Sequence, residues 1–497
     1  MLGTYITFPE LLVWLPFLAG ILCFFTGNEK TAKTIAFLAS VFTLLASLAS
    51  LLYIDPKYNS YNNVVYYWLK YLGSSLYFGL DGTGRLLTLL TAFTYPLIIA
   101  STWNRPVKNA SSFFGLLMLT QCGLMGVFTA MDALLFYFFW ELALIPVYFL
   151  ASKWGDERRI QATFKFFVYT FAGSLLMLIG IIYIYLHTPS RTFEDGTYSA
   201  HSFVITSFYN ASLTGSAQNW LFWLFFVAFA IKMPIFPFHT WQPDAYDQSP
   251  TPVTMVLSGI MVKMGLFGVL RWLLPLFPAA SEKYANIVMI LCIAGILYAS
   301  IVAMVQDNLK KMLAYSSIAH IGLMCAAIFA FKDAGMKGAM LQLFSHGINI
   351  IGMWMLAELL ERQMNVRSMS QLGGVAQKAP ALTIFMVIIS LANIALPLTN
   401  AFAGEFMMFN GLFQYNKWYA GIAGISVILA AVYTLNMLQK IFYGNTNTAT
   451  AAVKDISLNE KLALSIVVVA IFMTGVFPQP LVELTKDAAN WLLLRVG

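Results

Sequence analysis

Charged residues are scarce in this sequence. Only 10% of its 497 residues are Asp, Glu, Lys or Arg, and 59% are hydrophobic, whereas about a quarter of the residues are charged in ordinary soluble proteins. A globular domain with so little charge would not dissolve in water. Apolar runs recur from one end of the chain to the other, and a run of about 18 residues can cross a hydrocarbon core as a helix. We therefore expect the surrounding solvent to be lipid.

Cysteine and the common cofactor motifs are also scarce. The four cysteines lie inside apolar runs, with no CxxC pair and no histidine at metal-ligand spacing, so we expect small core residues and no metal or iron–sulfur centre. These cysteines are Cys23, Cys122, Cys292 and Cys325. No nucleotide-binding GxGxxG motif and no Gly/Ser linker is present. The sequence therefore predicts a single transmembrane domain over residues 1–497, with no cofactor in this chain.

Hydropathy predicts an all-α integral membrane protein with about 14 spans. Their centres lie near residues 18, 43, 93, 120, 142, 172, 228, 262, 294, 318, 348, 392, 430 and 468. The net charge of +7 comes from Lys and Arg scattered over short loops, which disfavours a nucleic-acid surface. These residues are denser after odd-numbered spans, so the positive-inside rule puts both termini outside the cytoplasm. No targeting peptide is apparent, and we expect a multi-pass protein of a bacterial inner membrane.

Two outer loops are long enough to hold structure of their own. Residues 64–80 alternate β-branched and aromatic side chains around Gly73, which predicts a β-hairpin. Residues 191–217 are polar, and we expect them to form an irregular cap.

Six ionisable residues lie inside the predicted spans, where each charge costs about 2.5–3.5 kcal/mol on insertion scales. Glu141, for example, lies nine residues after Asp132 and twelve before Lys153, close to mid-bilayer at about 1.5 Å per residue. Such groups tend to face protein or water and to have a function. The set is Glu141, Lys232, Lys263, His320, His346 and Glu405. Four others lie near span ends, where they can reach the interface: Lys165, Lys440, Glu358 and Glu361.

Two of these spans are predicted to be broken helices. Pro234 and Pro237 follow Lys232 in the seventh span, and Pro397 precedes Glu405 in the twelfth. Matched interruptions indicate an inverted-repeat transporter. Since the breaks are five spans apart, we expect two inverted five-helix repeats, spans 4–8 (about residues 111–275) and spans 9–13 (about 285–443). Spans 1–3 would be accessory, and a last span would cover about 460–480.

Several segments resemble the antiporter-like subunits of respiratory complex I, which are related to subunits of multi-subunit sodium/proton antiporters and membrane-bound hydrogenases. They are FYFFWELALIPVYFL, FAIKMPIFPFHTWQPDAYDQSPTPVTMVLSGIMVKMG, NLKKMLAYSSIAHIG and GEF. In that family the charge of the twelfth helix is usually lysine in the L and N types and in the antiporters, and glutamate in the M type. Glu405 therefore favours the M type. One segment, LPLTNAF, differs from a family pattern closer to LPGTSGF.

The resemblance implies a role for each buried charge. Glu141 would pair with Lys232, Lys263 would connect the two halves, His320 and His346 would form a hydrated middle, and Glu405 would release protons outward. A nearby carboxylate favours the charged form of a buried lysine, so we expect separation of Glu141 from Lys232 to drive proton release. The energy would come from quinone reduction in other subunits of an NADH:quinone oxidoreductase, with antiporter-like L and N subunits as neighbours.

Three other interpretations stay open from sequence. A sodium/proton antiporter or hydrogenase subunit would use nearly the same residues. A haem bound between His320 and His346 would need imidazoles on opposite faces of one macrocycle, and nothing else in the sequence supports it. An inert scaffold, with the charges as structural ion pairs, is disfavoured by the cost of burying them.

Overall fold

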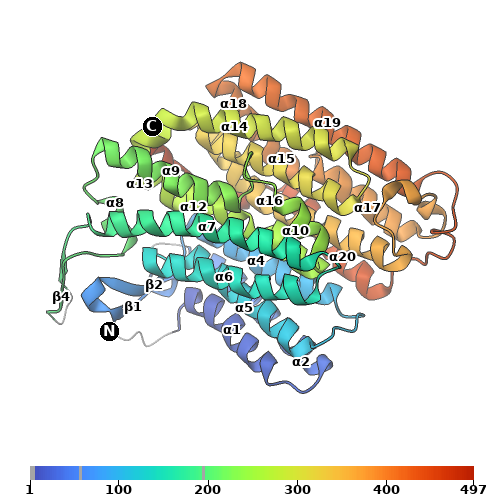
Figure 1. The fold of residues 1–497 in the computed structure, drawn as a ribbon, viewed down its shortest axis with the longest axis horizontal. Helices are drawn as coiled ribbons and strands as arrows, with labels where there is room; N and C mark the ends of the chain where they lie inside the picture. Colours follow the sequence, from blue (N-terminus) through green and yellow to red (C-terminus); the bar gives the residue numbers. More distant parts are fainter. Residues whose placement is uncertain (1–5, 55–58, 193–195, 497) are drawn as a thin grey trace.

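The fold is a bundle of long helices that run roughly side by side (Figure 1). The computed structural model describes residues 6–54, 59–192 and 196–496. Within them, 11 helical segments are long and apolar enough to span a membrane: Glu29–Tyr53, Gly82–Ser101, Ala110–Thr129, Ala133–Trp154, Arg159–Tyr185, Thr251–Leu276, Pro278–Val305, Leu309–Phe329, Asp333–Met364, Lys417–Phe442 and Leu458–Val476. Phe8–Phe24 and Pro380–Asn393 are shorter apolar helices. The predicted all-α membrane architecture is confirmed at this level.

The helices follow one another along the chain with short connections. The elements up to the middle of the chain are α1 (Phe8–Phe24), α2 (Glu29–Ser50), α3 (Asn59–Asn62), α4 (Gly82–Ser101), α5 (Ala110–Thr129), α6 (Ala133–Trp154), α7 (Arg159–Tyr185), α8 (Ile205–Tyr209), α9 (Gly215–Lys232), α10 (Gln242–Gln248), α11 (Thr251–Val256), α12 (Lys263–Gly268) and α13 (Leu274–Leu276). The remaining helices are α14 (Pro278–Val305), α15 (Leu309–Phe329), α16 (Asp333–Met364), α17 (Pro380–Asn393), α18 (Asn400–Tyr415), α19 (Lys417–Phe442), α20 (Leu458–Val476) and α21 (Gln479–Val496).

Several helices begin at a side chain that accepts hydrogen bonds from the first turn. Asn28, Asp132 and Asn308 do so before α2, α6 and α15, which satisfies amide groups that have no partner inside the helix. Pro278 and Pro380 occupy the first positions of α14 and α17, where the missing amide proton is tolerated. Local sequence therefore sets many of the helix starts.

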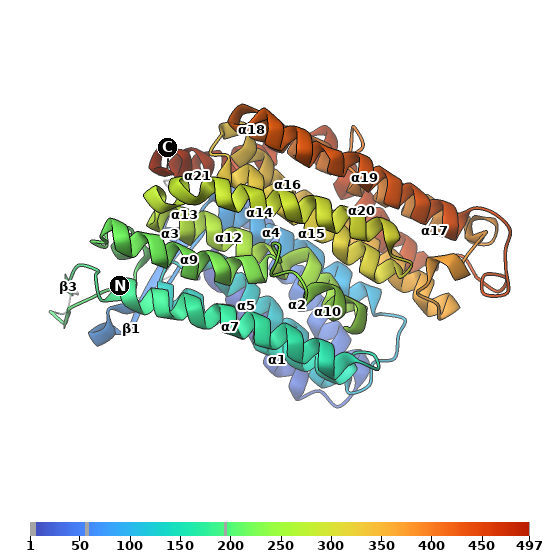
Figure 2. The ribbon, with the colours of Figure 1, turned by 45° about the horizontal axis from the view of Figure 1, so that its top comes forward.

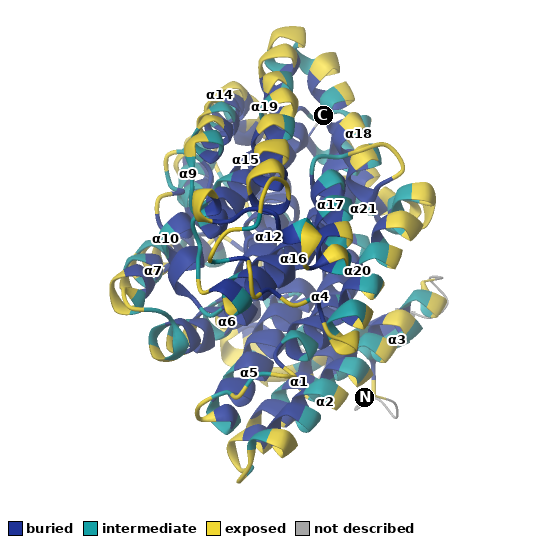
Figure 3. Cartoon of the chain, turned by 90° about the vertical axis from the view of Figure 1, so that its right-hand side faces the viewer, coloured by how far each residue is buried: buried dark blue, intermediate teal, exposed yellow. Residues whose placement is uncertain are grey.

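The centre of the bundle is formed by α4, α12 and α16, and burial falls toward the periphery (Figure 3). Thr251–Leu276 and Asp333–Met364 are buried along the whole of their most apolar stretch, whereas only 28% of that stretch is buried in Glu29–Tyr53. The α1, α2 and α5 helices lie at one extreme of the bundle and α18 and α19 at the other (Figures 1 and 2). Lys263 on α12 and His346 on α16 are therefore buried inside the bundle.

The predicted hairpin is confirmed. Strands β1 (Asn63–Leu69) and β2 (Ser74–Gly79) pair antiparallel, and Gly73 turns the chain with φ of 64°, a conformation that favours glycine. Asp132, the residue that begins α6, accepts hydrogen bonds from Ser74 Oγ and the Ser75 amide at 3.1 and 2.9 Å. The start of α1 and the end of α21 lie toward the hairpin end of the bundle (Figures 1 and 2).

The second outer loop is more regular than expected. Within residues 191–217 the described part contains β3 (Arg191–Thr192) paired with β4 (Tyr198–Ser199), and helix α8. The start of α9 at Gly215 also falls inside this range. The reason is anchoring: Ser199 Oγ donates to the Tyr71 carbonyl at 3.1 Å, and the Phe203 amide donates to the Gly73 carbonyl at 3.1 Å. The loop therefore covers the hairpin.

Both predicted breaks occur. Helix α9 ends at Lys232 and α10 begins at Gln242, while α17 ends at Asn393 and α18 begins at Asn400. The α16 and α18 helices approach closely, because a Cβ at Gly338 would lie 2.8 Å from the Gly404 carbonyl oxygen. Small residues permit such contacts between membrane helices, and this one holds the start of α18 against the central helix.

Candidate functional site

The most buried lysine lies at the centre of the bundle. Lys263 is fully buried and begins α12, directly after a wide π-helical turn over Leu257–Met261. Its ammonium donates to the Ser258 carbonyl at 2.7 Å and lies 2.9 Å from Nδ1 of His346 on α16. Wide turns of this kind are frequent at functional sites, since they leave carbonyl groups free to accept other donors. The structure therefore joins two of the predicted site residues directly.

The second histidine lies beside the first. The rings of His320 on α15 and His346 on α16 are 5.5 Å apart between centroids. Ser317 Oγ lies 3.4 Å from Nε2 of His346, so both ring nitrogens of His346 face polar neighbours. His320 is buried, and its Nε2 has no hydrogen-bonding partner among the described residues. Lys263, His346 and His320 thus form one polar cluster inside an apolar bundle.

The predicted pair of Glu141 and Lys232 lies apart from this cluster. Lys232 ends α9 with its ammonium 5.5 Å from the ring of Trp140 and 6.0 Å from that of Phe166. Neither this ammonium nor Oε1 of Glu141 has a hydrogen-bonding partner in the described part of the chain. The two charges are close enough to interact electrostatically. They are therefore neighbours that are not in direct contact.

The last predicted residue, Glu405, lies in the first half of α18 and is only 8% exposed. Its charge acts on the hydroxyl of Tyr433 on α19, and that hydroxyl lies 2.9 Å from Ser316 Oγ on α15. None of the described contacts joins Glu405 directly to a histidine. The sequence analysis did not single out Tyr433, Ser316 or Ser317, because a lone hydroxyl in a span is common and gives no signal without its neighbours.

Charges near the span ends are paired, unlike most of the central ones. Glu358 forms an ion pair with Arg105. Glu361 pairs with Lys310 at 2.6 Å and with Arg367 at 2.5 Å. Basic partners from neighbouring loops and from the start of α15 therefore reach both glutamates near the span ends.

The two lower-ranked lysines differ from each other. Lys165 pairs with Asp244 at 2.9 Å, whereas Lys440 is exposed near the end of α19. Neither lysine belongs to the buried central set, since the Lys165 side chain is 36% exposed.

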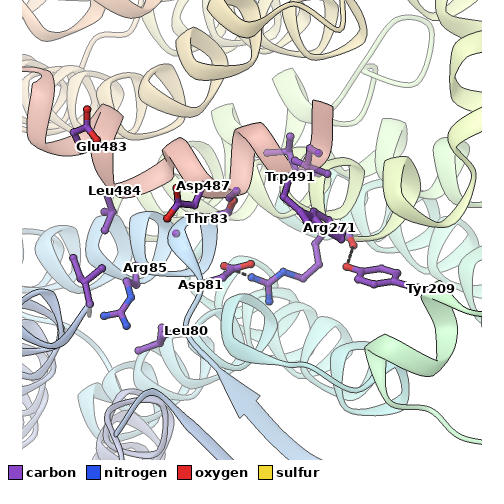
Figure 4. A pocket seen from close by; sticks show the side chains of 15 residues that line it. Leu80, Asp81, Thr83, Arg85, Tyr209, Arg271, Glu483, Leu484, Asp487 and Trp491 are labelled. Carbon is purple, nitrogen blue, oxygen red and sulfur yellow. Dashed lines mark hydrogen bonds and ion pairs between the residues drawn. The ribbon is translucent and has the colours of Figure 1, made fainter. Parts of the chain in front are cut away.

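Polar pockets lie toward both ends of the bundle. One of about 150 Å³ is lined by Lys165 and Asp244 between α7 and α10. Another of about 360 Å³ lies at the hairpin end (Figure 4). In that pocket Asp81 pairs with the buried Arg271, and the Tyr209 hydroxyl donates to the Arg271 carbonyl at 2.8 Å. Charged side chains are therefore within reach of solvent at either end.

The geometry does not favour a haem between the two histidines, because Lys263 and Ser317 already face the ring nitrogens of His346. The described residues contain no group of three or more His, Cys, Asp or Glu that could hold a metal ion.

The chain is similar to known membrane proteins. A model of the NADH:quinone oxidoreductase/Mrp antiporter transmembrane family matches residues 130–432. The chain belongs to this family. NADH-quinone oxidoreductase subunit M of Rickettsia prowazekii (strain Madrid E) is 36% identical over 484 residues, covering 96% of each chain. The subunit M of Escherichia coli (strain K12) is 33% identical over 499 residues, again covering 96% of each. All six predicted site residues lie inside the region that the family model matches.

Solved structures agree. A chain of respiratory complex I from Thermus thermophilus with bound NADH superposes with a TM-score of 0.88 at 28% identity, covering 98% of this chain and 99% of that one. A chain of the Mrp complex from Dietzia sp. DQ12-45-1b gives a TM-score of 0.83 at 19% identity, covering 99% of both. At that identity, the second likeness concerns the fold.

Proposed function

We propose that the chain is the proton-translocating antiporter-like subunit, of the M type, in a membrane-bound NADH:quinone oxidoreductase. The observation that carries this proposal is the buried cluster of Lys263, His346 and His320, with an unpaired Lys232 near Glu141 on one side and Glu405 beyond it. Charges that only stabilise packing would have oppositely charged partners, as Glu358 and Glu361 have. Unpaired buried charges are kept where they do work.

The proposed path begins at Lys232. Withdrawal of Glu141 weakens the hold of Lys232 on its proton, because a nearby carboxylate stabilises the charged ammonium. The proton then passes by way of the central cluster to Glu405 and outward. The pair of Lys165 and Asp244, beside the pocket on α7 and α10, supplies ionisable groups for reloading from the cytoplasm.

The energy source lies outside this chain. Glu141 is only partly buried, and α6 exposes Phe138, Ile145 and Phe149 on its outer face. This face suits contact with a neighbouring antiporter-like subunit of the L or N type, whose charges could displace Glu141. Quinone reduction elsewhere in the complex would drive the displacement, with no redox cofactor in this chain.

The finer architecture belongs to the same proposal. It has 14 spans, with inverted repeats over spans 4–8 and 9–13 and both termini on the periplasmic side of a bacterial inner membrane. The breaks after Lys232 and Asn393, and the common end at which the termini lie, support this arrangement. A sodium/proton antiporter subunit is the alternative, supported by the fold shared with the Mrp complex.

Proton pumping in inner-membrane vesicles from a strain with Glu141→Gln tests the function. We expect NADH:quinone turnover and pumping to fall by about tenfold or more while the complex assembles, and Glu157→Gln, an exposed glutamate, to leave both unchanged. Wild-type pumping and turnover with Glu141→Gln would make this carboxylate structural. Pumping that needs sodium would favour the antiporter alternative.

A further inference from the structure

Two hydroxyl groups lie between the central histidines and Glu405. Tyr433 on α19 and Ser316 on α15 are 3% and 1% exposed, and their oxygens are 2.9 Å apart. Glu405 is the carboxylate whose charge acts on Tyr433. Ser316 thus contacts a side chain that is close enough to Glu405 to interact with it electrostatically, and the three residues lie on three different helices.

Ser316 lies on the same stretch of α15 as His320. His320 follows Ser316 by four residues on α15, and residues four apart are neighbours on a helix surface. Ser317, the next residue along, lies 3.4 Å from His346. One stretch of α15 therefore places a hydroxyl near His346 and another beside Tyr433, one helical turn from His320.

The position of Ser316 is also tied to the second break. Asn393, the last residue of α17, donates its side-chain amide to Ser316 Oγ at 3.5 Å. The hydroxyl pair is therefore held by the end of α17 as well as by α15 and α19. A hydroxyl is suited to relay a proton, because it donates one hydrogen while it accepts another.

We propose that the hydroxyl groups of Ser316 and Tyr433 relay protons from His320 to Glu405. The inference rests on the function proposed above. It names the groups that carry the proton between His320 and Glu405, a step for which the described contacts of the six charged residues provide no direct link. In one transfer, the O–H bond of Tyr433 breaks as its proton reaches the Glu405 carboxylate, directly or through a water molecule. The phenolic oxygen takes the proton of Ser316, and Ser316 takes the proton of the His320 imidazolium. Each hydroxyl ends with one proton, and the net change is one proton moved.

The test uses the complete complex in inner-membrane vesicles, with pumping and NADH:quinone turnover measured together. Tyr433→Phe keeps the ring and removes only the hydroxyl, and we expect pumping to fall about fivefold, the factor that corresponds to one lost hydrogen bond. Ser316→Ala should lower it similarly, whereas Ser316→Thr keeps a hydroxyl and should retain pumping. Tyr419→Phe, on the same helix but partly exposed, is the matched control and should pump at the wild-type rate.

Further results separate a relay from packing. If the two hydroxyls form one path, Tyr433→Phe combined with Ser316→Ala should be no worse than either alone. Wild-type pumping in Tyr433→Phe, together with loss in Glu405→Gln, would overturn the relay and leave the proposed function intact. Wild-type pumping in both would overturn the proposed function as well. If Tyr433→Phe assembles poorly, equal pumping by Ser316→Ala and Ser316→Thr would overturn the relay.

Discussion

The two broken helices look alike in sequence but are stabilised in different ways. In the first break the Trp241 indole donates to the Ile231 carbonyl at 2.9 Å, so the freed backbone group is satisfied within the same span. In the second, Asn349 on α16 donates to the Ala392 carbonyl at 3.1 Å, and Ser345 on α16 donates to the Asn400 carbonyl at 2.9 Å. Broken backbone at membrane depth requires such partners. Among the residues that the structure describes, the second break obtains them from another helix and the first does not.

This difference affects how each break is connected to the central histidine. Ser345 and Asn349 flank His346 on α16, so the helix that holds the second break also carries the central histidine. In the first break the residues next to Lys232 are buried, with Met233 and Ile235 at 0% and 2% exposure. In the second, Leu396 and Leu398 are 44% and 68% exposed. The first break thus surrounds Lys232 with buried residues. The second is hydrogen-bonded to the central helix α16 on one side and exposes leucine side chains on the other.

The largest expected effect is on the enclosed lysine. Lys232→Met removes the charge but keeps a side chain of similar length, and an apolar replacement in a buried site is tolerated for stability. Proton pumping by the assembled complex should fall by about tenfold or more. Lys440→Met, at an exposed lysine, is the control. Normal pumping with Lys232→Met would show that Lys232 has only a structural role. The difference between the two breaks would then have no bearing on proton pumping.

A smaller effect is expected from the hydrogen bonds that close each break. Trp241→Phe removes the side-chain donor of the Ile231 carbonyl. Asn349→Leu removes one of the two donors of the Ala392 carbonyl, which keeps its bond from the Ala395 amide. A lost hydrogen bond of this kind costs about 0.5–1.5 kcal/mol. Hydrogen–deuterium exchange in the intact complex should speed up around residues 392–400 for Asn349→Leu and around 231–241 for Trp241→Phe. We expect Asn349→Leu also to speed exchange in the middle of α16. If faster exchange stays confined to the mutated break in both variants, the second break is not coupled to α16.

The smallest effect concerns backbone strain in the second break. Leu398 has φ of 74°, a left-handed conformation that costs most residues about 1–2 kcal/mol. Leu398→Gly should stabilise the segment by up to about 1 kcal/mol, because the entropy of glycine offsets part of the gain. Slower exchange at residues 394–400 would show this. Leu396→Gly, at a position without a positive φ, should slow nothing; an equal gain there would argue against strain as the cause.

The same residue explains a departure that was visible in the sequence. Leu398 stands in the segment LPLTNAF, at the position where the resembling family more often has glycine. The structure retains the turn that glycine would favour, with a leucine in the left-handed region. Two residues later, Asn400 exchanges hydrogen bonds with Ser345 on α16, which hold this end of the break in place.

Much of the fold and of the candidate site followed from the sequence by itself. Hydropathy located the membrane helices, because each must satisfy its backbone internally in lipid. Proline located the breaks, since it removes an amide donor. The insertion cost of charge singled out Lys263, His346 and the other four residues.

Tertiary structure alone decided which of them meet. Lys263 reaches His346 at 2.9 Å, while Glu141 and Lys232 are near but not in contact. The bond between Ser316 and Tyr433 joins residues 117 positions apart, and neither has a charge to mark it in the sequence. A charged residue in an apolar segment is visible in the sequence at its own position. A hydrogen bond between two helices depends on how those helices pack, and no local pattern of residues determines the distance between the two side chains.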